Sequence, residues 1–439
     1  MAAAPTNLRP NATLDAVLSA ARDDYVAKRP KSKAAHEAAT DFMPGGNTRT
    51  VLYHDPFPLR VVHGEGQNIT DADGFSYVNM LGEYTAGLFG HSHPVIRRAI
   101  DAALDHGISL SAHGEGEISL ARLICQRFPA IERVRFTNSG TEANLMAIST
   151  ARVVSGRRKV LVFDGGYHGG LLYFAHGGIP INAPFPYVLA PYNDIAETQR
   201  LIREHAADLA CVLVEPMMGS GGCLPASTEF LEMMRRETSA AGVVLIFDEV
   251  MTSRLAPGGV QELSGVMPDM TTLGKYIGGG MSFGAFGGRA DLMDIYDPRR
   301  PDAIPHAGTF NNNALTMAAG TAALAEVYTP EVAIGHNARG DQLRQRLNAI
   351  IQARQLPLQF TGVGSLLGLH AKAGDISAPG DLDDANDRIA ELIFFDLLDA
   401  GYYIARRGFI ALSLPLTDAD LDGFATAFED ILELRASVF

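Results

Sequence analysis

The sequence has few cysteines, no apolar run of membrane length and no basic stretch. Each of these absences excludes some classes of function. The three cysteines, Cys125, Cys211 and Cys223, match no metal-binding spacing. We therefore expect inert, mostly buried thiols, no metal site and a reducing, cytoplasmic setting. No segment approaches the roughly 20 apolar residues that cross a bilayer. The first residues include early acids and lack the basic and apolar regions of an export signal, so we expect none.

Positive charge is also scarce. The chain of 439 residues carries 36 Lys and Arg against 50 Asp and Glu, a formal net charge of -14. Such a surface repels nucleic acids and anionic membranes, so neither is expected as a partner. An anionic substrate would need local arginines. With 47% hydrophobic residues, the chain can bury a large core in two or three domains.

Short apolar runs alternate with helical patterns between residues 71 and 328. This alternation predicts an α/β fold with a mainly parallel sheet covered on both faces. Helices are predicted at 142–154 and 230–240. In such a sheet, ligands gather at the carboxyl ends of the strands. The predicted strands are 134–136, 160–163, 187–189, 211–214, 243–247 and 283–286.

The two ends of the chain follow other patterns. Residues 12–40 have helical spacing up to the Pro44-Gly45-Gly46 stop. Near the C-terminus, strands are predicted at 365–370 and 409–414, with a helix at 384–400 between them. Thr417 to Asp420 form a capping box that opens a last helix. We predict three parts: an N-terminal segment (1–70) that packs on the small domain, a large domain (71–330) and a small α+β domain (331–439).

Lys275 and Asp248 are the most informative pair. Lys275 stands among glycines, and Asp248 ends an apolar run upstream. A lysine amine can condense with the aldehyde of pyridoxal phosphate (PLP), and a carboxylate can pair with the pyridinium nitrogen. This pattern therefore predicts a PLP enzyme, although a lone lysine of this kind is usually a solvated loop residue.

Two further segments provide groups that suit PLP. Ser139, Gly140 and Thr141 follow a strand and open a helix, an arrangement that binds phosphate or simply caps the helix. Tyr167, after another strand and two glycines, can stack on a flat ring or serve in the core. Glu215 ends a strand where it could contact the phenolic edge of the cofactor.

Six motifs in this order resemble the class III aminotransferases. They are Asn-Ser-Gly-Thr-Glu-Ala (138–143), Gly-Gly-Tyr-His-Gly (165–169), Glu-Pro (215–216), Asp-Glu-Val-Met-Thr (248–252), Leu-Gly-Lys-Tyr-Ile-Gly-Gly-Gly (273–280) and Gly-Thr-Phe (308–310). The resemblance covers about 43–435 and is strongest to the aromatic β-amino acid (β-phenylalanine) transaminases. It implies fold type I: a large domain with a mainly parallel, seven-stranded sheet and a smaller α+β domain.

The resemblance also assigns the cofactor residues. It implies that Lys275 binds PLP covalently and moves the proton, while Asp248 holds the pyridinium. It implies that Tyr167 stacks on the ring and that Ser139, Gly140 and Thr141 bind the phosphate. Thr309 is implied to bind the phosphate of a neighbouring subunit, which makes the active unit a homodimer with shared sites.

Substrate roles are implied in the same way. Arg49 matches the receptor of the substrate carboxylate, and Tyr84 can form an aromatic wall. Arg407 matches a mobile arginine that receives the second carboxylate of the acceptor, with its neighbour Arg406 as the alternative. The expected reaction moves the amino group of a β-amino acid such as 3-amino-3-phenylpropanoate to 2-oxoglutarate or pyruvate.

Two other functions stay open. An isomerase like glutamate-1-semialdehyde 2,1-aminomutase would use the same scaffold but need no added 2-oxo acid. The pattern around Arg49 favours the transaminase. A PLP-binding regulator would normally carry a DNA-binding domain, for which the sequence provides no basic region. The histidines in His91-Ser-His93-Pro are expected to form a turn because no acidic or Cys partner stands at ligand spacing.

Overall fold

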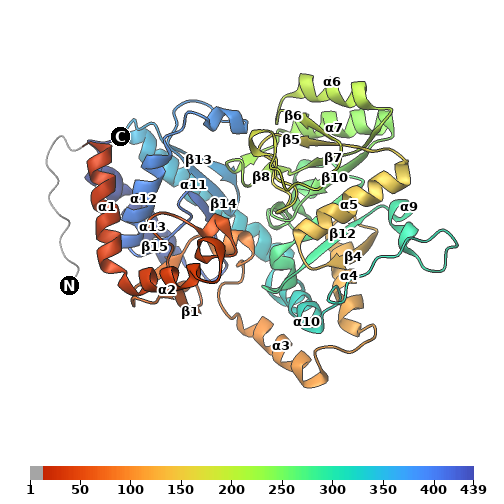
Figure 1. The fold of residues 1–439 in the computed structure, drawn as a ribbon, viewed down its shortest axis with the longest axis horizontal. Helices are drawn as coiled ribbons and strands as arrows, with labels where there is room; N and C mark the ends of the chain where they lie inside the picture. The colour runs from red at the N-terminus through yellow and green to blue at the C-terminus, as the bar shows by residue number, and fades with distance from the viewer. Residues whose placement is uncertain (1–12) are drawn as a thin grey trace.

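The computed structural model describes residues 13–439, which form two packed lobes around separate sheets (Figure 1). The larger lobe is built on a seven-stranded sheet of order β4-β12-β11-β10-β7-β5-β6, in which only β12 runs antiparallel to its neighbours. The fold-class prediction is thus confirmed. The strands are β4 (Arg133–Thr137), β5 (Lys159–Phe163), β6 (Tyr187–Ala190), β7 (Leu209–Val214), β10 (Val244–Asp248), β11 (Met270–Gly274) and β12 (Gly284–Gly288).

Both faces of this sheet are covered by helices because alternate strand residues are apolar on both sides. In β7, Cys211 and Leu213 pack on the side of α5 (Gly140–Ser155). Val212 and Val214 point to the opposite side, into the core that holds α6 (Ile195–His205) and α7 (Thr228–Ala241). Burial on both faces produces the continuous apolar runs seen in the sequence. The same lobe also contains α3 (Pro94–His106), α4 (Glu115–Arg127), α8 (Gly259–Ser264), α9 (Ala290–Met293) and α10 (Ala314–Ala322).

Strand β11 was not predicted, although it leads directly into Lys275. Its sequence, Met-Thr-Thr-Leu-Gly, is too polar to read as a buried run. Both threonines are nevertheless fully buried. The hydroxyl of Thr271 accepts a hydrogen bond from Gln261 Nε2 at 3.2 Å, and Thr272 Oγ1 donates to Asn144 Oδ1 at 2.7 Å. Buried hydroxyls are tolerated when they are paired in this way.

The predicted N-terminal helix at 12–40 is wrong in its continuity. Two helices are present, α1 (Leu14–Lys28) and α2 (Pro30–Thr40), and residue 12 lies outside the described part. The break falls at Arg29, whose backbone (φ -125°, ψ 52°) is not helical. Proline lacks an N–H and disfavours helical geometry in the residue before it, so Pro30 ends one helix and opens the next.

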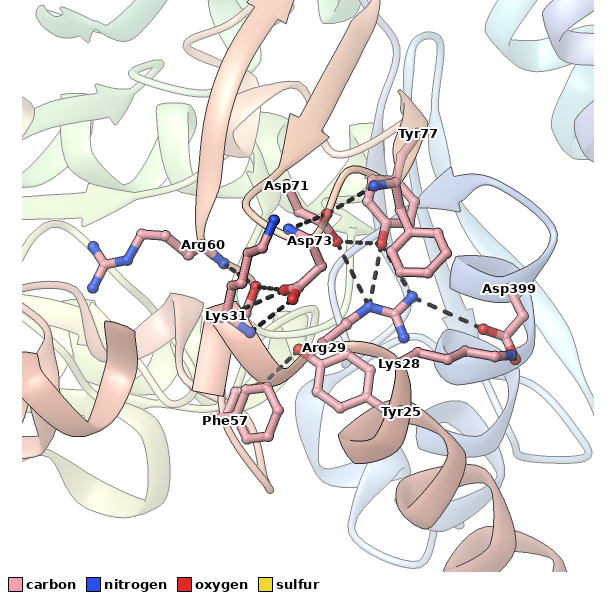
Figure 2. A network of polar contacts seen from close by, with 12 residues as sticks. Tyr25, Lys28, Arg29, Lys31, Phe57, Arg60, Asp71, Asp73, Tyr77 and Asp399 are labelled. Atoms are coloured by element: carbon pink, nitrogen blue, oxygen red, sulfur yellow. Dashed lines mark hydrogen bonds and ion pairs between the residues drawn. The ribbon is translucent and has the colours of Figure 1, made fainter. Parts of the chain in front are cut away.

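Arg29, at this break, ties the N-terminal helices to the smaller lobe (Figure 2). Its side chain is buried, and its Nη2 donates to the Tyr77 hydroxyl at 3.0 Å. Tyr77 in turn donates to Asp71 Oδ2 at 2.7 Å. The guanidinium also lies over the Tyr25 ring, with Asp399 3.9 Å away. The charge is therefore paired and stacked within the core.

The smaller lobe unites both ends of the chain, and in Figure 1 the N-terminal helices lie beside the C-terminal ones. A four-stranded sheet of order β1-β2-β3-β15 joins residues from both ends. A three-stranded antiparallel sheet, β13-β14-β16, packs with the long helices. The elements are β1 (Val61–Glu65), β2 (Asn68–Asp71), β3 (Ser76–Asn79), α11 (Pro330–Ala353), β13 (Gln359–Val363), β14 (Leu366–His370), α12 (Asp387–Asp399), β15 (Tyr402–Tyr403), β16 (Phe409–Ala411) and α13 (Asp418–Leu434).

Most C-terminal predictions are confirmed. The capping box of Thr417 and Asp420 is present, with the Thr417 N–H donating to Asp420 Oδ2 at 2.8 Å. The strand predicted at 409–414 is too long, because β16 ends at Ala411 and Leu412 N instead bonds Ser365 O at 2.9 Å. The domain boundaries at 70 and 330 stay a prediction. Among the described residues, no helix combines the length and the apolar character needed to cross a bilayer.

Candidate active site

The predicted cofactor residues lie at one edge of the large sheet, where its parallel strands end. β10 ends at Asp248, and β11 runs directly into Lys275. β4 leads to Ser139 at the start of α5, and β7 ends just before Glu215. Because these strands are parallel, their carboxyl ends meet and bring distant motifs together.

Asp248 is buried and held by a full set of donors. Its Oδ2 accepts from Asn144 Nδ2 at 2.8 Å and lies 2.7 Å from His168 Nδ1. Its Oδ1 accepts from the Val250 N–H at 3.0 Å. A carboxylate fixed by several donors stays in one orientation, ready to face a cationic ring nitrogen.

Lys275 is partly buried at the base of the same edge and has a left-handed backbone (φ +54°). A residue with a Cβ adopts this conformation at some cost, so the surroundings must impose it. Burial lowers the pKa of the Lys275 amine to about 8, while the charges of Asp248 and Glu215 oppose the shift. A lower pKa leaves more of the neutral amine, which is the nucleophilic form, near pH 7.

The start of α5 has free backbone N–H groups of the kind that bind anions, and we call it the anion site. Ser139 caps the helix by accepting from Glu142 N at 3.2 Å, and helix geometry leaves the N–H groups of Gly140 and Thr141 without an acceptor inside the helix. A Cβ on Gly140 would lie 2.9 Å from the methyl groups of Val250, so only glycine lets the helix start this close to β10. Thr141 Oγ1 also accepts from Gly170 N at 3.3 Å, which joins the anion site to the loop after β5.

Tyr167 and Glu215 form the side of the site next to β7. The Tyr167 ring is 45% exposed and packs edge-on against Tyr173. Glu215 is buried, and burial raises the pKa of its carboxyl group. Its two oxygens accept backbone N–H groups of Tyr167 at 2.8 Å and Gly219 at 3.0 Å. Glu215 thus fixes the position of Tyr167, and its predicted cofactor contact stays a prediction.

Arg49 and Tyr84 come from different segments and lie at the outer side of the site. Arg49 Nη1 is paired with Glu83 Oε1, and both side chains are about half exposed. The Tyr84 hydroxyl donates to Val51 O at 3.0 Å. Arg49 and Arg407 both act on the Tyr167 hydroxyl electrostatically, lowering a pKa that burial raises. Both arginines are therefore within electrostatic range of Tyr167.

Arg407 and Arg406 point to different places. The Arg407 guanidinium lies 5.5 Å from the Tyr84 ring centroid and 5.6 Å from that of Phe409. Its Nη1 donates to Ser220 O at 3.1 Å and to Ser220 Oγ at 3.2 Å. Arg406 Nη1 instead pairs with the buried Glu391 at 3.3 Å. This arrangement favours Arg407 as the arginine that faces the site.

Thr309 stands apart from this group within one chain. It is exposed and lines a surface groove of about 560 Å³ with residues 106–117. Its loop does touch the anion site, since Asn138 Nδ2 donates to Asn311 Oδ1 at 3.0 Å. The contact of Thr309 with a phosphate therefore stays a prediction that depends on a second subunit.

Sequence analysis assigned no contact with Asp248 to Asn144, Thr272 or His168. All three hold Asp248: Thr272 Oγ1 lies 3.4 Å from its Oδ1 and 2.7 Å from Asn144 Oδ1. The available signal was a polar Asn on the buried face of a predicted helix. Such a side chain needs a buried partner.

The groups at this edge suit PLP. The Lys275 amine interacts electrostatically with the fixed Asp248 carboxylate, and the start of α5 and the exposed Tyr167 follow strands of the same sheet. These match the aldehyde, the ring nitrogen, the phosphate and the ring face of the cofactor.

Comparison with known proteins also indicates a PLP-dependent enzyme. The family model of class III aminotransferases matches residues 52–432, so the chain belongs to this PLP-dependent family. It is 50% identical to a β-phenylalanine transaminase of Variovorax paradoxus, over 95% of this chain and 96% of that one. It is also 37% identical to a glutamate-1-semialdehyde 2,1-aminomutase of Nitratidesulfovibrio vulgaris, over 89% and 96%. The crystal structure of a β-phenylalanine aminotransferase from Variovorax paradoxus superposes with a TM-score of 0.96 at 48% identity, covering 97% of this chain and 99% of that one.

Proposed function

We propose that the protein transfers the amino group of an aromatic β-amino acid, such as 3-amino-3-phenylpropanoate, to 2-oxoglutarate or pyruvate. The observation that carries this proposal is the pair of arginines beside an aromatic platform. Arg49 lies on one side, while Arg407 rests on the stacked rings of Tyr84 and Phe409. The 50% identity to a β-phenylalanine transaminase supports the same substrate class.

In this proposal PLP supplies the electron sink, and the chain supplies position and proton transfer. Lys275 Nζ would hold the cofactor and would move the proton away from the carbon that bears the amino group. The Asp248 carboxylate would pair with the ring nitrogen, and the N–H groups at the start of α5 would hold the phosphate. Tyr167 would provide an aromatic contact for the ring.

The substrate groups are held by the outer residues. A β-amino acid has its carboxylate one carbon farther from the amine than an α-amino acid has. Arg49, on the segment before the 3-10 turn Thr50–Leu52, can receive that carboxylate through two parallel N–H donors. The aryl group then lies toward Tyr84 and Phe409. For 2-oxoglutarate, Arg407 pairs with the second carboxylate.

A donor panel tests this proposal. The enzyme is mixed with α-, β- and ω-amino donors and 2-oxoglutarate, and glutamate formation is measured. We expect 3-amino-3-phenylpropanoate to give a kcat/KM well above that of phenylalanine or 3-phenylpropylamine. Preference for an α-amino acid or a simple amine would contradict the substrate class.

The aminomutase alternative has less support. The relative that carries this name is 37% identical, against 50% for the transaminase. A mutase returns the amine to the molecule that supplied it, so it has no need for two arginines that receive different substrates.

Arg407→Ala is expected to weaken the binding of the acceptor, 2-oxoglutarate, more than the binding of the amino donor. Loss of a charge-assisted contact to a carboxylate costs about 1.5–3 kcal/mol, so KM for 2-oxoglutarate should rise about ten- to a hundred-fold. KM for 3-amino-3-phenylpropanoate should change little in this variant. Arg49→Ala, by contrast, should weaken the binding of both substrates. Steady-state kinetics with each substrate varied in turn measures this. Arg406→Ala is the matched control, and a selective acceptor defect there instead would transfer the role to Arg406.

We also propose a homodimer with shared sites, in which Thr309 reaches the phosphate of the second subunit. The groove beside Thr309 is rich in exposed apolar side chains: Phe310 is 62% exposed, Leu110 52% and Ile108 51%. Exposed apolar surface of this kind is typical of protein interfaces. A cytoplasmic location remains a prediction.

Charging this groove should break the dimer. Phe310→Glu is expected to shift the protein from dimer to monomer in sedimentation, and the monomer should lose PLP more readily on dialysis. Leu263→Glu, at a residue of α8 that is 57% exposed, is the control. An active wild-type monomer would contradict the proposal.

A further inference from the structure

Beside the substrate site, four consecutive residues adopt left-handed backbone geometry. Gly82, Glu83, Tyr84 and Thr85 have φ values of +52°, +50°, +50° and +80°. Only glycine adopts this geometry freely, so three residues with side chains are held in an unfavourable conformation. Such strain persists only where surrounding contacts impose it, and it is concentrated at functional sites.

The turn is fixed from several directions. Asn79 Oδ1 accepts from Leu81 N at 3.0 Å and from Gly82 N at 3.1 Å, and Gly87 N donates to Gly82 O at 2.9 Å. A Cβ on Gly82 would collide with Ala411 O of β16, so the turn packs directly on the smaller lobe. The Tyr84 ring stacks on Phe409 at 5.5 Å.

This rigid turn aims Glu83 at Arg49. The two side chains form an ion pair, and the Tyr84 hydroxyl holds Val51 O, two residues beyond Arg49, at 3.0 Å. The turn is thus joined to the Arg49 segment at two points. The backbone of the turn and its contacts with the Arg49 segment therefore fix the relative positions of the two side chains.

The ion pair with Glu83 neutralises the charge of Arg49. Glu83 and Arg49 are 52% and 46% exposed, and an exposed ion pair of this kind is weak. A substrate carboxylate that bonds both guanidinium nitrogens is a better partner. The carboxylate of a ligand can therefore displace Glu83, whereas an uncharged group cannot.

We propose that Glu83 is a specificity-determining residue that competes with the substrate carboxylate for Arg49. This inference rests on the proposed function, in which Arg49 is the carboxylate receptor. Glu83 keeps Arg49 paired when a ligand has no carboxylate. A ligand with a carboxylate must bind Arg49 more strongly than Glu83 does in order to displace it.

Calorimetric titration of the PLP-loaded enzyme with unreactive ligands tests the competition without turnover. The probes are 3-phenylpropanoate and its uncharged analogue 3-phenylpropanamide. Glu83→Gln should tighten the carboxylate about two- to five-fold, the factor that corresponds to one exposed ion pair. Binding of the amide should not change. Glu37→Gln removes the same charge from a pair with Lys33 on α2 and is the control.

Four results would count against the inference, and they can be told apart. If Arg49→Ala does not weaken 3-phenylpropanoate, Arg49 is not the receptor and the proposed function of this site fails as well. If Arg49→Ala weakens it but Glu83→Gln does not tighten it, the competition alone is wrong. If Glu37→Gln tightens the binding of 3-phenylpropanoate equally, the effect comes from net charge alone. If Glu83→Gln tightens the binding of the amide, the effect comes from altered packing. Either result overturns the role of Glu83.

Discussion

Replacing Lys275 with alanine is expected to preserve the fold and to lower the turnover rate by several orders of magnitude. In the proposed mechanism the Lys275 amine both holds the cofactor covalently and moves the proton, so proximity and general base catalysis are lost together. The anion site at α5 and the donors around Asp248 do not depend on Lys275, so PLP should still bind without a covalent bond. Single-turnover kinetics and the absorbance of the bound cofactor measure the two effects separately.

Lys33→Ala, at a half-exposed lysine on α2, serves as the control and should keep wild-type turnover. Turnover of 3-amino-3-phenylpropanoate by Lys275→Ala near the wild-type rate would show that another group performs the proton transfer. Loss of PLP binding together with the fold would instead make Lys275 a structural residue.

The second large effect is expected from Asp248→Asn, which should spare cofactor binding and slow the half-reaction at least about a hundred-fold. A neutral amide cannot hold the positive charge on the ring nitrogen, so the cofactor loses its strength as an electron sink. The amide nitrogen would also face donors, either Asn144 Nδ2 or the Val250 N–H. Stopped-flow absorbance with the donor alone measures the rate.

Glu249→Gln is the matched control for this variant. Glu249 is the next residue, is equally buried, and accepts from Val260 N at 2.7 Å and Gln261 N at 3.1 Å. Since its partners belong to α8, we expect a lower melting temperature with an unchanged rate per folded enzyme. If Asp248→Asn behaves in the same way, Asp248 is structural and does not partner the ring.

Much of the cofactor edge could be predicted because Asp248 and Ser139 each follow a predicted strand, and parallel strands bring such ends together. Lys275 was assigned instead from its glycine-rich motif and the family resemblance. The strand before Lys275 was not predicted because Thr271 and Thr272 make its sequence too polar for a buried strand. Their hydroxyls are hydrogen-bonded only once the core has folded.

The substrate side was predicted less completely because it depends on backbone geometry. No propensity indicates a left-handed run at Glu83 and Tyr84, since asparagine and glycine are the residues usually found there. Likewise, adjacent arginines cannot be told apart by spacing alone. Their partners separate them: Arg406 meets Glu391, and Arg407 meets Ser220 and the ring of Tyr84.

The most direct test of the central claim is the reaction of the PLP-loaded enzyme with 3-amino-3-phenylpropanoate when no 2-oxo acid is present. A transaminase should release one equivalent of 3-oxo-3-phenylpropanoate per active site and then stop until an acceptor is added. Quantifying the product by chromatography against the enzyme concentration gives the ratio. Product that keeps accumulating without an acceptor, or none at all, would contradict amino transfer from an aromatic β-amino acid.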